Sequence, residues 1–135
     1  MKRRPLEVVA AMLVRENRFL LCRRPLHKAR GGQWEFPGGK VEAGETKFEA
    51  IVRELREELN ITVEPLRECA NALYDYPDLT VSLTLIWAKI AEGEPELLEH
   101  LDAKWVTAQE AAAMELCPAD RILLRQVERM ENYGI

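Results

Sequence analysis

The sequence predicts a mixed α/β fold in which helices pack on a mixed β-sheet. Strand-like segments come first, one amphipathic helix lies in the middle, and helical segments close the chain. This order is typical of a mixed sheet with helices packed on it. The 135 residues are enough to bury a sizeable core, and no repeat or Pro/Ser-rich linker divides them. We therefore expect a single domain over residues 1–135.

The N-terminal part is predicted to start with a hairpin. Glu7–Val14 and Arg18–Cys22 have the composition of strands, and Asn17 in the turn between them suits a positive φ. Residues 25–33 form a basic, glycine-containing loop. The extended piece Trp34–Phe36 follows and runs into a turn at residues 37–39.

The central helix has recognisable ends. Thr46 and Glu49 make a capping box at its start, and Asn60 can close it in the left-handed conformation. Five side chains form a narrow apolar stripe for the core: Phe48, Ile51, Val52, Leu55 and Leu59.

The C-terminal half is predicted to hold a long hairpin and two helices. Its strands, rich in β-branched and aromatic residues, are Thr62–Tyr74 and Leu79–Ile90. Trp105–Val106 is a short strand, and Thr107–Glu115 and Asp120–Glu131 are helices. The last helix is amphipathic through Ile122, Leu123, Val127 and Met130.

Charge and composition exclude several classes of protein. The net charge of −4 argues against a nucleic-acid polymer as the main partner, but not against a nucleotide whose charge a metal carries. The three cysteines are odd in number and widely spaced, which disfavours a zinc site or a disulfide framework. No apolar run approaches the roughly 18 residues of a membrane span. We expect a cytoplasmic protein without a membrane partner.

The most informative feature is the acidic face of the central helix. Glu54, Glu57 and Glu58 lie at i, i+3 and i+4, so their carboxylates share one face and repel one another unless a cation lies among them. Such a cluster of hard oxygen ligands suits Mg²⁺, and Mn²⁺ is the second candidate. The alternative is a solvated charged face.

Three details favour the metal site. Ala50 is a small residue on the acidic face, which leaves room for a ligand. Arg53 can pair with Glu57 at i+4 and hold its carboxylate. Gly38 and Gly39 allow backbone carbonyls to approach a metal closely.

The spacing within this stretch resembles a known motif. Gly39 is followed after five residues by Glu45, and after seven more by the run Arg53–Glu58. This pattern is similar to the Nudix box, whose family hydrolyses nucleoside diphosphates linked to another group. Asn60 stands where the family usually has glycine, and asparagine is the next-best residue for a left-handed cap.

Further segments resemble the MutT branch of that family, which covers 8-oxo-dGTP diphosphatases and relatives acting on CTP or modified dCTP. They are the paired Arg23–Arg24, the run Glu35–Lys40, the turn Tyr76-Pro77-Asp78 and the segment Pro118-Ala119-Asp120. The resemblance implies the Nudix fold, with a mixed sheet sandwiched between helices. It also implies a nucleoside triphosphate substrate, attacked at the β-phosphorus to release a monophosphate and pyrophosphate.

The resemblance also implies roles for the motif residues. A carbonyl of Gly38 or Gly39 and the carboxylates of Glu54, Glu57 and Glu58 would bind Mg²⁺. Glu54 is the preferred base for the attacking water. Arg53 would orient carboxylates without touching substrate, and Glu45 would support the loop and the helix N-terminus.

Four residues outside the helix are candidates for substrate binding: Arg24, Glu35, Phe36 and Asp120. Arg24 would contact phosphate, with a surface arginine as the alternative. Phe36 would stack on the base or belong to the core. Asp120 would read the base edge, accepting from an amine or donating if protonated, or would be the N-cap of the last helix.

The remaining assignments stay open. Glu99 is an accessory ligand or base, or a solvated loop acid, and His27 and His100 receive no role. An ADP-ribose or dinucleotide hydrolase is one alternative function, and a non-catalytic nucleotide-binding domain is another. The chain would act as a monomer or homodimer.

Overall fold

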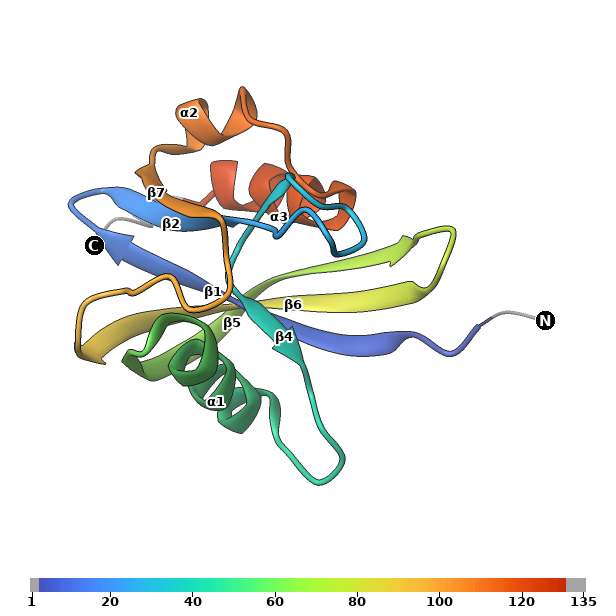
Figure 1. Ribbon diagram of the computed structural model, residues 1–135, viewed down its shortest axis with the longest axis horizontal. Helices are drawn as coiled ribbons and strands as arrows, with labels where there is room; N and C mark the ends of the chain where they lie inside the picture. Colours follow the sequence, from blue (N-terminus) through green and yellow to red (C-terminus); the bar gives the residue numbers. More distant parts are fainter. Residues whose placement is uncertain (1–2, 131–135) are drawn as a thin grey trace.

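The computed structural model describes residues 3–130, which form a mixed sheet with helices on both faces (Figure 1). The strands are β1 (Leu6–Arg15), β2 (Arg18–Arg23), β3 (Trp34–Glu35), β4 (Gly38–Lys40), β5 (Thr62–Asp75), β6 (Thr80–Glu92) and β7 (Asp102–Val106). The helices are α1 (Lys47–Leu59), α2 (Ala108–Ala112) and α3 (Pro118–Glu128).

Strand β1 is the centre of the sheet. It pairs in parallel with β6, which in turn pairs antiparallel with β5. Its other edge pairs antiparallel with β4 over Val8–Ala10 and with β2 at Val14–Arg15. Strand β2 also carries β3 and β7. The sheet is therefore mixed, as the sequence predicted.

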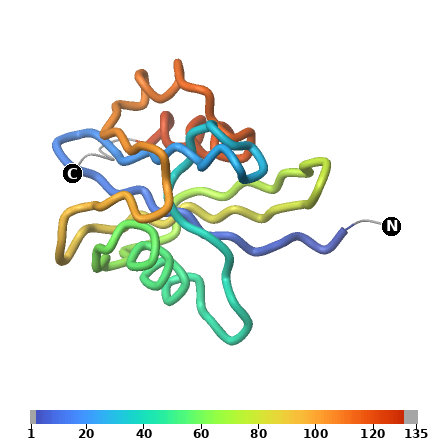
Figure 2. Tube along the Cα trace, viewed as in Figure 1, coloured from blue at the N-terminus to red at the C-terminus, as the bar shows by residue number. Residues whose placement is uncertain are grey.

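Alternation along β1 assigns its side chains to two cores. Val9, Ala11 and Leu13 pack in a cluster with side chains of α1, whereas Ala10 and Met12 pack with side chains of α3. Because successive residues of a strand face opposite sides, both faces of β1 are covered. Figure 2 follows the same chain path, with α1 on one side of the sheet and α2 and α3 on the other. The predicted sandwich is confirmed.

Most predicted elements are confirmed within one or two residues. Glu16 and Asn17 have φ values of 51° and 62°, which fits the tight turn predicted between the first two strands. The capping box of α1 is formed by Thr46 and Glu49, and Asn60 ends the helix with φ 53°. The long hairpin is present, with its strands extended to Asp75 and Glu92.

Three local predictions were wrong. Gly38 and Gly39, predicted to lie in a turn at residues 37–39, belong to strand β4, because β1 offers them a pairing edge. Phe48 is 37% exposed and lies outside the core. The second helix ends at Ala112 and not at Glu115, because the backbone beyond it pairs with Trp34: the Trp34 N–H donates to the Glu115 carbonyl at 2.8 Å.

The last helix begins earlier than predicted. Pro118 occupies its first turn, where a missing N–H costs nothing, and Cys117 is the N-cap without a side-chain cap bond. The helix ends at Glu128, and the predicted end at Glu131 lies outside the described residues. Over residues 3–130, no helix combines the length and apolar character needed to cross a membrane.

Gly38 provides a test of how closely β4 lies against β1. A Cβ at Gly38 would collide with the carbonyl oxygen of Val9, so we expect Gly38→Ala to lower the free energy of unfolding by at least about 2 kcal/mol. Gly44→Ala is the control, since no atom lies within 4 Å of its added Cβ, although its φ of 83° strains alanine by about 1 kcal/mol. Urea denaturation followed by circular dichroism measures both, and equal losses would contradict the prediction.

Candidate active site

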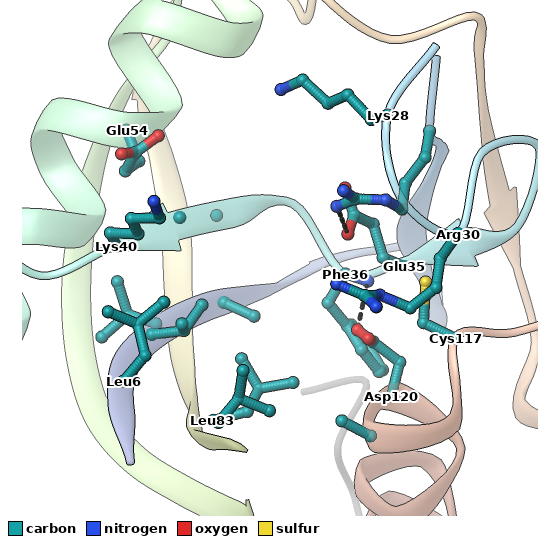
Figure 3. Close-up of a pocket in the computed structure, with 18 of the residues that line it drawn as sticks. Leu6, Lys28, Arg30, Glu35, Phe36, Lys40, Glu54, Leu83, Cys117 and Asp120 are labelled. Carbon is teal, nitrogen blue, oxygen red and sulfur yellow. Dashed lines mark hydrogen bonds and ion pairs between the residues drawn. The ribbon is translucent and has the colours of Figure 1, made fainter. Parts of the chain in front are cut away.

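A cavity of about 590 Å³ opens between α1, β4, the 25–33 loop and the start of α3 (Figure 3). We call the part lined by Glu54, Glu57 and Glu58 the acidic end. We call the part lined by Phe36, Tyr76, Cys117 and Asp120 the α3 end. All the site residues proposed from the sequence line this one cavity.

The three glutamates of the acidic end differ in exposure. The side chains of Glu54, Glu57 and Glu58 are 15%, 56% and 8% exposed. Burial, followed by the charges of Glu35 and Glu54, raises the pKa of Glu58 to about 9. Burial also raises the pKa of Glu54. A uniformly solvated face is therefore excluded.

The predicted role of Ala50 was wrong. Ala50 is fully buried in the core between α1 and the sheet and does not leave room beside the glutamates. Besides Ile51, Leu55 and Leu59 of the predicted apolar stripe, the buried face of α1 includes Ala50 and Glu58. This face is therefore wider around the helix than predicted.

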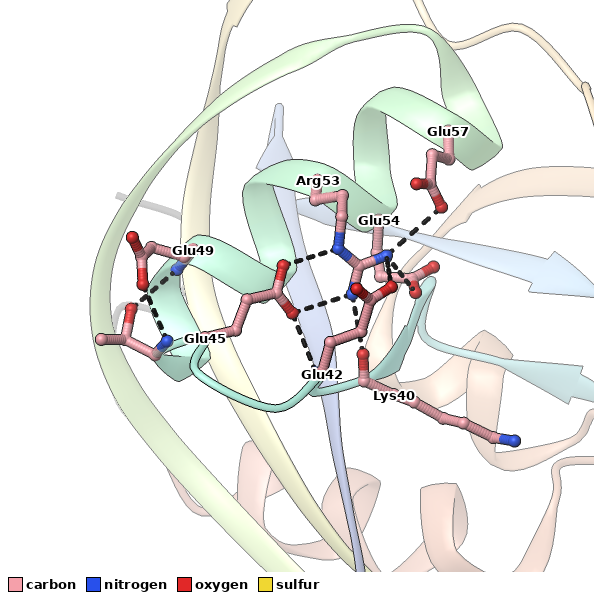
Figure 4. A network of polar contacts seen from close by, with 8 residues as sticks. Lys40, Glu42, Glu45, Glu49, Arg53, Glu54 and Glu57 are labelled. Atoms are coloured by element: carbon pink, nitrogen blue, oxygen red, sulfur yellow. Dashed lines mark hydrogen bonds and ion pairs between the residues drawn. The ribbon is translucent and has the colours of Figure 1, made fainter.

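Arg53 organises the acidic end (Figure 4). Its Nε and Nη2 donate to both oxygens of Glu45 at 2.6 and 2.9 Å, and Nη1 donates to Glu54 at 2.9 Å and Glu57 at 3.3 Å. Nη2 also donates to the Lys40 carbonyl at 2.9 Å. The hydrogen bond from Arg53 lowers the pKa of Glu45 to about 2. The predicted Arg53–Glu57 pair is present, and Glu45 supports the loop as predicted.

The acidic end has the donors that a hard divalent cation prefers. Oε1 of Glu58 is buried and has no hydrogen-bond partner among the described residues. A Cβ at Gly39 would collide with the Glu54 carboxylate, so glycine is needed for this carboxylate to lie against the β4 backbone. A buried carboxylate oxygen without a donor, on the same helical face as a second carboxylate that lies against backbone, fits Mg²⁺ or Mn²⁺.

A second polar group occupies the α3 end. Within residues 3–130, Glu35, Cys117 and Asp120 are the one group of three whose potential ligand atoms all lie within 4.8 Å of one another. Burial, followed by the charge of Glu35, raises the pKa of Asp120, and burial raises the pKa of the Cys117 thiol. A raised pKa favours the protonated forms of Asp120 and Cys117, and a protonated carboxyl and a soft thiol suit hydrogen bonding better than binding of a hard cation.

Asp120 is not the N-cap of α3. It lies in the first turn, and its Oδ1 accepts a hydrogen bond from the backbone N–H of Phe36 at 3.0 Å. The Asp120 side chain therefore binds the backbone at Phe36, directly after β3, and is buried at the α3 end of the cavity.

The other substrate-binding candidates are tied to this group. Glu35 accepts from Arg24 Nη1 at 2.9 Å, and Arg24 Nε donates to the Ala29 carbonyl. Phe36 is buried and stacks on Phe19 with ring centroids 5.4 Å apart. The ring of Phe36 is thus mainly a core residue that forms one wall of the cavity.

The 25–33 loop is anchored by Arg30, a residue with no role in the sequence analysis. The guanidinium of Arg30 lies 4.0 Å from the ring centroid of Tyr76, and its Nη1 pairs with Asp78 at 3.1 Å. The Tyr76 hydroxyl accepts from the Ala119 N–H at 2.9 Å. These contacts connect the 25–33 loop through the β5–β6 turn to the N-terminus of α3.

His100 is the residue that sequence analysis missed. Its side chain is 2% exposed, and its Nε2 lies 3.0 Å from Glu35 Oε2 and 3.9 Å from Glu58 Oε2. An isolated histidine after a glutamate-rich loop gave no periodic signal from which this position could be found. Glu99, beside it, is exposed and lines the cavity, and its charge contributes to the raised pKa of Glu54 and Glu58.

Comparison with known proteins assigns the chain to a family. The NUDIX domain matches residues 3–127. This chain belongs to the Nudix family. The CTP pyrophosphohydrolase of Escherichia coli (strain K12) is 37% identical over 119 residues, which cover 88% of each protein. The 8-oxo-dGTP diphosphatase of the same strain is 30% identical over 126 residues, covering 93% of this chain and 98% of that protein.

Solved structures agree with this assignment. The crystal structure of a MutT protein from Methanosarcina mazei Go1 matches this Nudix protein with a TM-score of 0.84 and 26% identity, over 96% of this chain and 94% of the other. The predicted resemblance to MutT-type Nudix proteins is therefore confirmed, and the protein is a hydrolase.

Glu58 generates a prediction about pH and metal. Its pKa in the folded protein, about 9, exceeds the ordinary 4.5, so its contribution to stability is complete below about pH 4.5 and is lost as pH rises toward 9. In metal-free buffer, we expect the unfolding free energy of Glu58→Gln to fall less between about pH 5 and pH 9 than that of the wild type. Mg²⁺ should raise the wild-type melting temperature by about 2 to 5 °C and leave Glu58→Gln unchanged.

Thermal unfolding at stepped pH, with EDTA or MgCl₂, measures both effects. Glu128→Gln, an exposed glutamate of α3, is the control and should behave as the wild type. If the unfolding free energy of Glu58→Gln fell with pH as steeply as that of the wild type, the pH dependence could not be assigned to Glu58.

Proposed function

We propose that this Nudix hydrolase is a Mg²⁺-dependent nucleoside triphosphate pyrophosphohydrolase. It converts oxidised or modified nucleoside triphosphates, such as 8-oxo-dGTP, or (d)CTP, to the monophosphate and pyrophosphate. The observation that carries the proposal is the single cavity that joins the acidic end to the α3 end. One end has hard oxygen donors suited to a metal-bound polyphosphate, and the other has buried polar groups suited to a base.

At the acidic end, Glu54, Glu57, Glu58 and a carbonyl of Gly38 or Gly39 would hold Mg²⁺. When bound, the metal neutralises phosphate charge and polarises a bridging phosphate. Glu54 takes the proton of the attacking water, since its pKa is raised by burial toward the range of an effective base. Arg53 contacts no substrate, because its nitrogens are occupied by carboxylates and the Lys40 carbonyl, and its role is to orient Glu54 and Glu57.

Arg24 would contact the phosphates. Its Nε and Nη1 bind the Ala29 carbonyl and Glu35, which fixes the plane of the guanidinium against the cavity wall. A guanidinium held in this way presents its remaining N–H groups at little further cost in side-chain entropy.

At the α3 end, Asp120 and Glu35 would read the base. Asp120, with its raised pKa, donates from its protonated carboxyl, and Glu35, paired with Arg24, accepts. A donor beside an acceptor matches N3 and the N4 amine of cytosine, and also O6 and N1–H of an oxidised guanine. Phe36 contributes the apolar wall and the N–H that orients Asp120.

The alternatives are less well supported. A non-catalytic nucleotide-binding domain would not need all three box carboxylates, and here they are present with the arginine that orients them. A hydrolase of ADP-ribose or of a dinucleotide remains the second candidate, since it would use the same acidic end. We also propose a reducing, cytoplasmic location, which fits three free cysteines and a substrate from the nucleotide pool.

A substrate screen tests the proposal. Purified protein with Mg²⁺ should release pyrophosphate from at least one of 8-oxo-dGTP, dCTP, CTP, 5-methyl-dCTP and dGTP. Glu54→Gln should lower kcat at least about 100-fold, because the base for water is lost, whereas Glu128→Gln should have no effect. If no triphosphate is turned over, the proposed function is wrong; if Glu54→Gln keeps its rate, the assignment of the base is wrong.

Asp120→Asn and Asp120→Ala test recognition of the base. With its oxygen accepting from the Phe36 N–H, the amide of asparagine can donate to the base as the protonated carboxyl does, so we expect Asp120→Asn to keep kcat/KM within about 3-fold of the wild type. Asp120→Ala removes the donor and should lower kcat/KM on the preferred nucleotide about 10-fold or more. Steady-state kinetics on the same five nucleotides measure both effects, and an unchanged kcat/KM in Asp120→Ala would show that Asp120 does not read the base.

A further inference from the structure

His100 is held in a fixed place by the loop that carries it. This loop, residues 93–101, joins β6 to β7 and is bound to the C-terminal end of α1. The Glu96 N–H donates to the Leu59 carbonyl at 2.9 Å, and the Leu98 N–H donates to the Glu58 carbonyl at 3.2 Å. Beyond His100, the Leu101 N–H donates to the Arg23 carbonyl at 2.9 Å. The imidazole therefore enters the protein between α1 and β2 with little freedom.

The two ring nitrogens have very different surroundings. Nε2 lies 3.0 Å from Glu35 Oε2, within hydrogen-bond distance, and 3.9 Å from Glu58 Oε2, beyond it. Nδ1 is buried and has no hydrogen-bond partner among the described residues. Because Nε2 faces Oε2 of a carboxylate whose Oε1 already accepts from Arg24, Nε2 is the donor of this hydrogen bond.

A buried nitrogen without a partner lowers stability, and an apolar side chain of similar size would avoid that cost. The fold thus gains little from a histidine at this position. What His100 provides is the hydrogen bond to Glu35: Arg24 holds Oε1 at 2.9 Å and His100 holds Oε2 at 3.0 Å, so both carboxylate oxygens are fixed.

We propose that His100 is a positioning residue that determines substrate affinity through Glu35 and does not act through the metal-binding carboxylates. The two distances separate these possibilities, since a hydrogen bond is possible at 3.0 Å and not at 3.9 Å. A fixed Glu35 carboxylate presents its remaining lone pairs to the base in one orientation, which avoids the cost of ordering it on binding. The inference rests on the proposed function in that it takes Glu35 as a base-contacting residue.

Two variants of His100 test the proposal. His100→Leu removes the donor but fills similar space, and His100→Gln keeps an N–H donor that can reach Glu35. We expect His100→Leu to raise KM for the preferred nucleoside triphosphate about 10- to 100-fold, as for loss of a hydrogen bond to a charged group. Its kcat and the Mg²⁺ concentration for half-maximal rate should stay within about 3-fold of the wild type. His100→Gln should recover most of the affinity.

The controls separate positioning from a structural role. His27→Leu changes the other histidine, which is exposed, and should leave KM and kcat unchanged. The melting temperature of His100→Leu should equal or exceed that of the wild type. Inhibition by inorganic tripolyphosphate, which has no base, should be the same in all variants.

Each contrary result has a definite meaning. An unchanged KM in His100→Leu would overturn the proposal. A fall in kcat together with a raised Mg²⁺ requirement would also overturn it, because it would show that His100 acts through the metal-binding carboxylate of Glu58. A lowered melting temperature with no recovery in His100→Gln would make the residue structural and also overturn it.

Calorimetric binding of CMP and 8-oxo-dGMP makes the test independent of turnover. His100→Leu should weaken binding of the preferred monophosphate by the same factor as KM. If the wild type bound a monophosphate but hydrolysed no triphosphate, the proposed function would fail while this inference could still be confirmed. If the wild type bound neither monophosphate, Glu35 would not be a base-contacting residue and the inference would be wrong.

Discussion

The contact of β4 with both β1 and α1 determines where the other parts of the site lie. At Gly38 the backbone lies so close to Val9 that a side chain would not fit, and at Gly39 it lies against the Glu54 carboxylate. The sheet, the helix and the cavity therefore meet along two residues without side chains. Arg53 strengthens this junction, because its guanidinium binds the Lys40 carbonyl at the end of β4 as well as the carboxylates of α1.

The cavity is an unfavourable place for its own charged groups. Glu58 and Asp120 are buried, and the pKa of each is raised mainly by that burial. Such groups reduce stability unless a cation or a hydrogen-bonding ligand satisfies them. The surrounding sheet and helices compensate through two apolar clusters, one on each face of β1. The arrangement is typical of sites in which stability is lost locally in favour of function.

The sequence predicted the parts of this molecule that depend on local rules. The capping box of Thr46, the left-handed Asn60 and the turn at Glu16–Asn17 depend on a few neighbouring residues, and all are present. The predictions were wrong where the backbone forms hydrogen bonds with a segment distant in the sequence. Trp34 pairs with residues after α2 and shortens that helix, and pairing with β1 makes Gly38 and Gly39 part of a strand where a turn is expected from the sequence.

The same distinction applies to the candidate site. The box glutamates and Arg53 follow from helical spacing, so their neighbourhood could be predicted. The burial of Ala50 and Glu58 could not, because it depends on how α1 is rotated against the sheet. The sequence alone allows Asp120 to cap a helix or to read a base, and the position of the Phe36 N–H, 84 residues away, shows which contact it makes. His100 reaches Glu35 across 65 residues, a separation that no local pattern reveals.

The attachment of residues 93–101 to α1 has a consequence for local opening of the protein. Two backbone N–H groups of this loop bind the carbonyls of Glu58 and Leu59, which a helix end would otherwise leave to water. The last turn of α1 can therefore fray only if the loop detaches, and detachment also withdraws His100 from Glu35. The end of α1 and the loop therefore form one cooperative unit of local unfolding. The rate of amide exchange at Glu96 and Leu98 would report how often this unit opens, and thus the fraction of molecules in which the cavity is assembled.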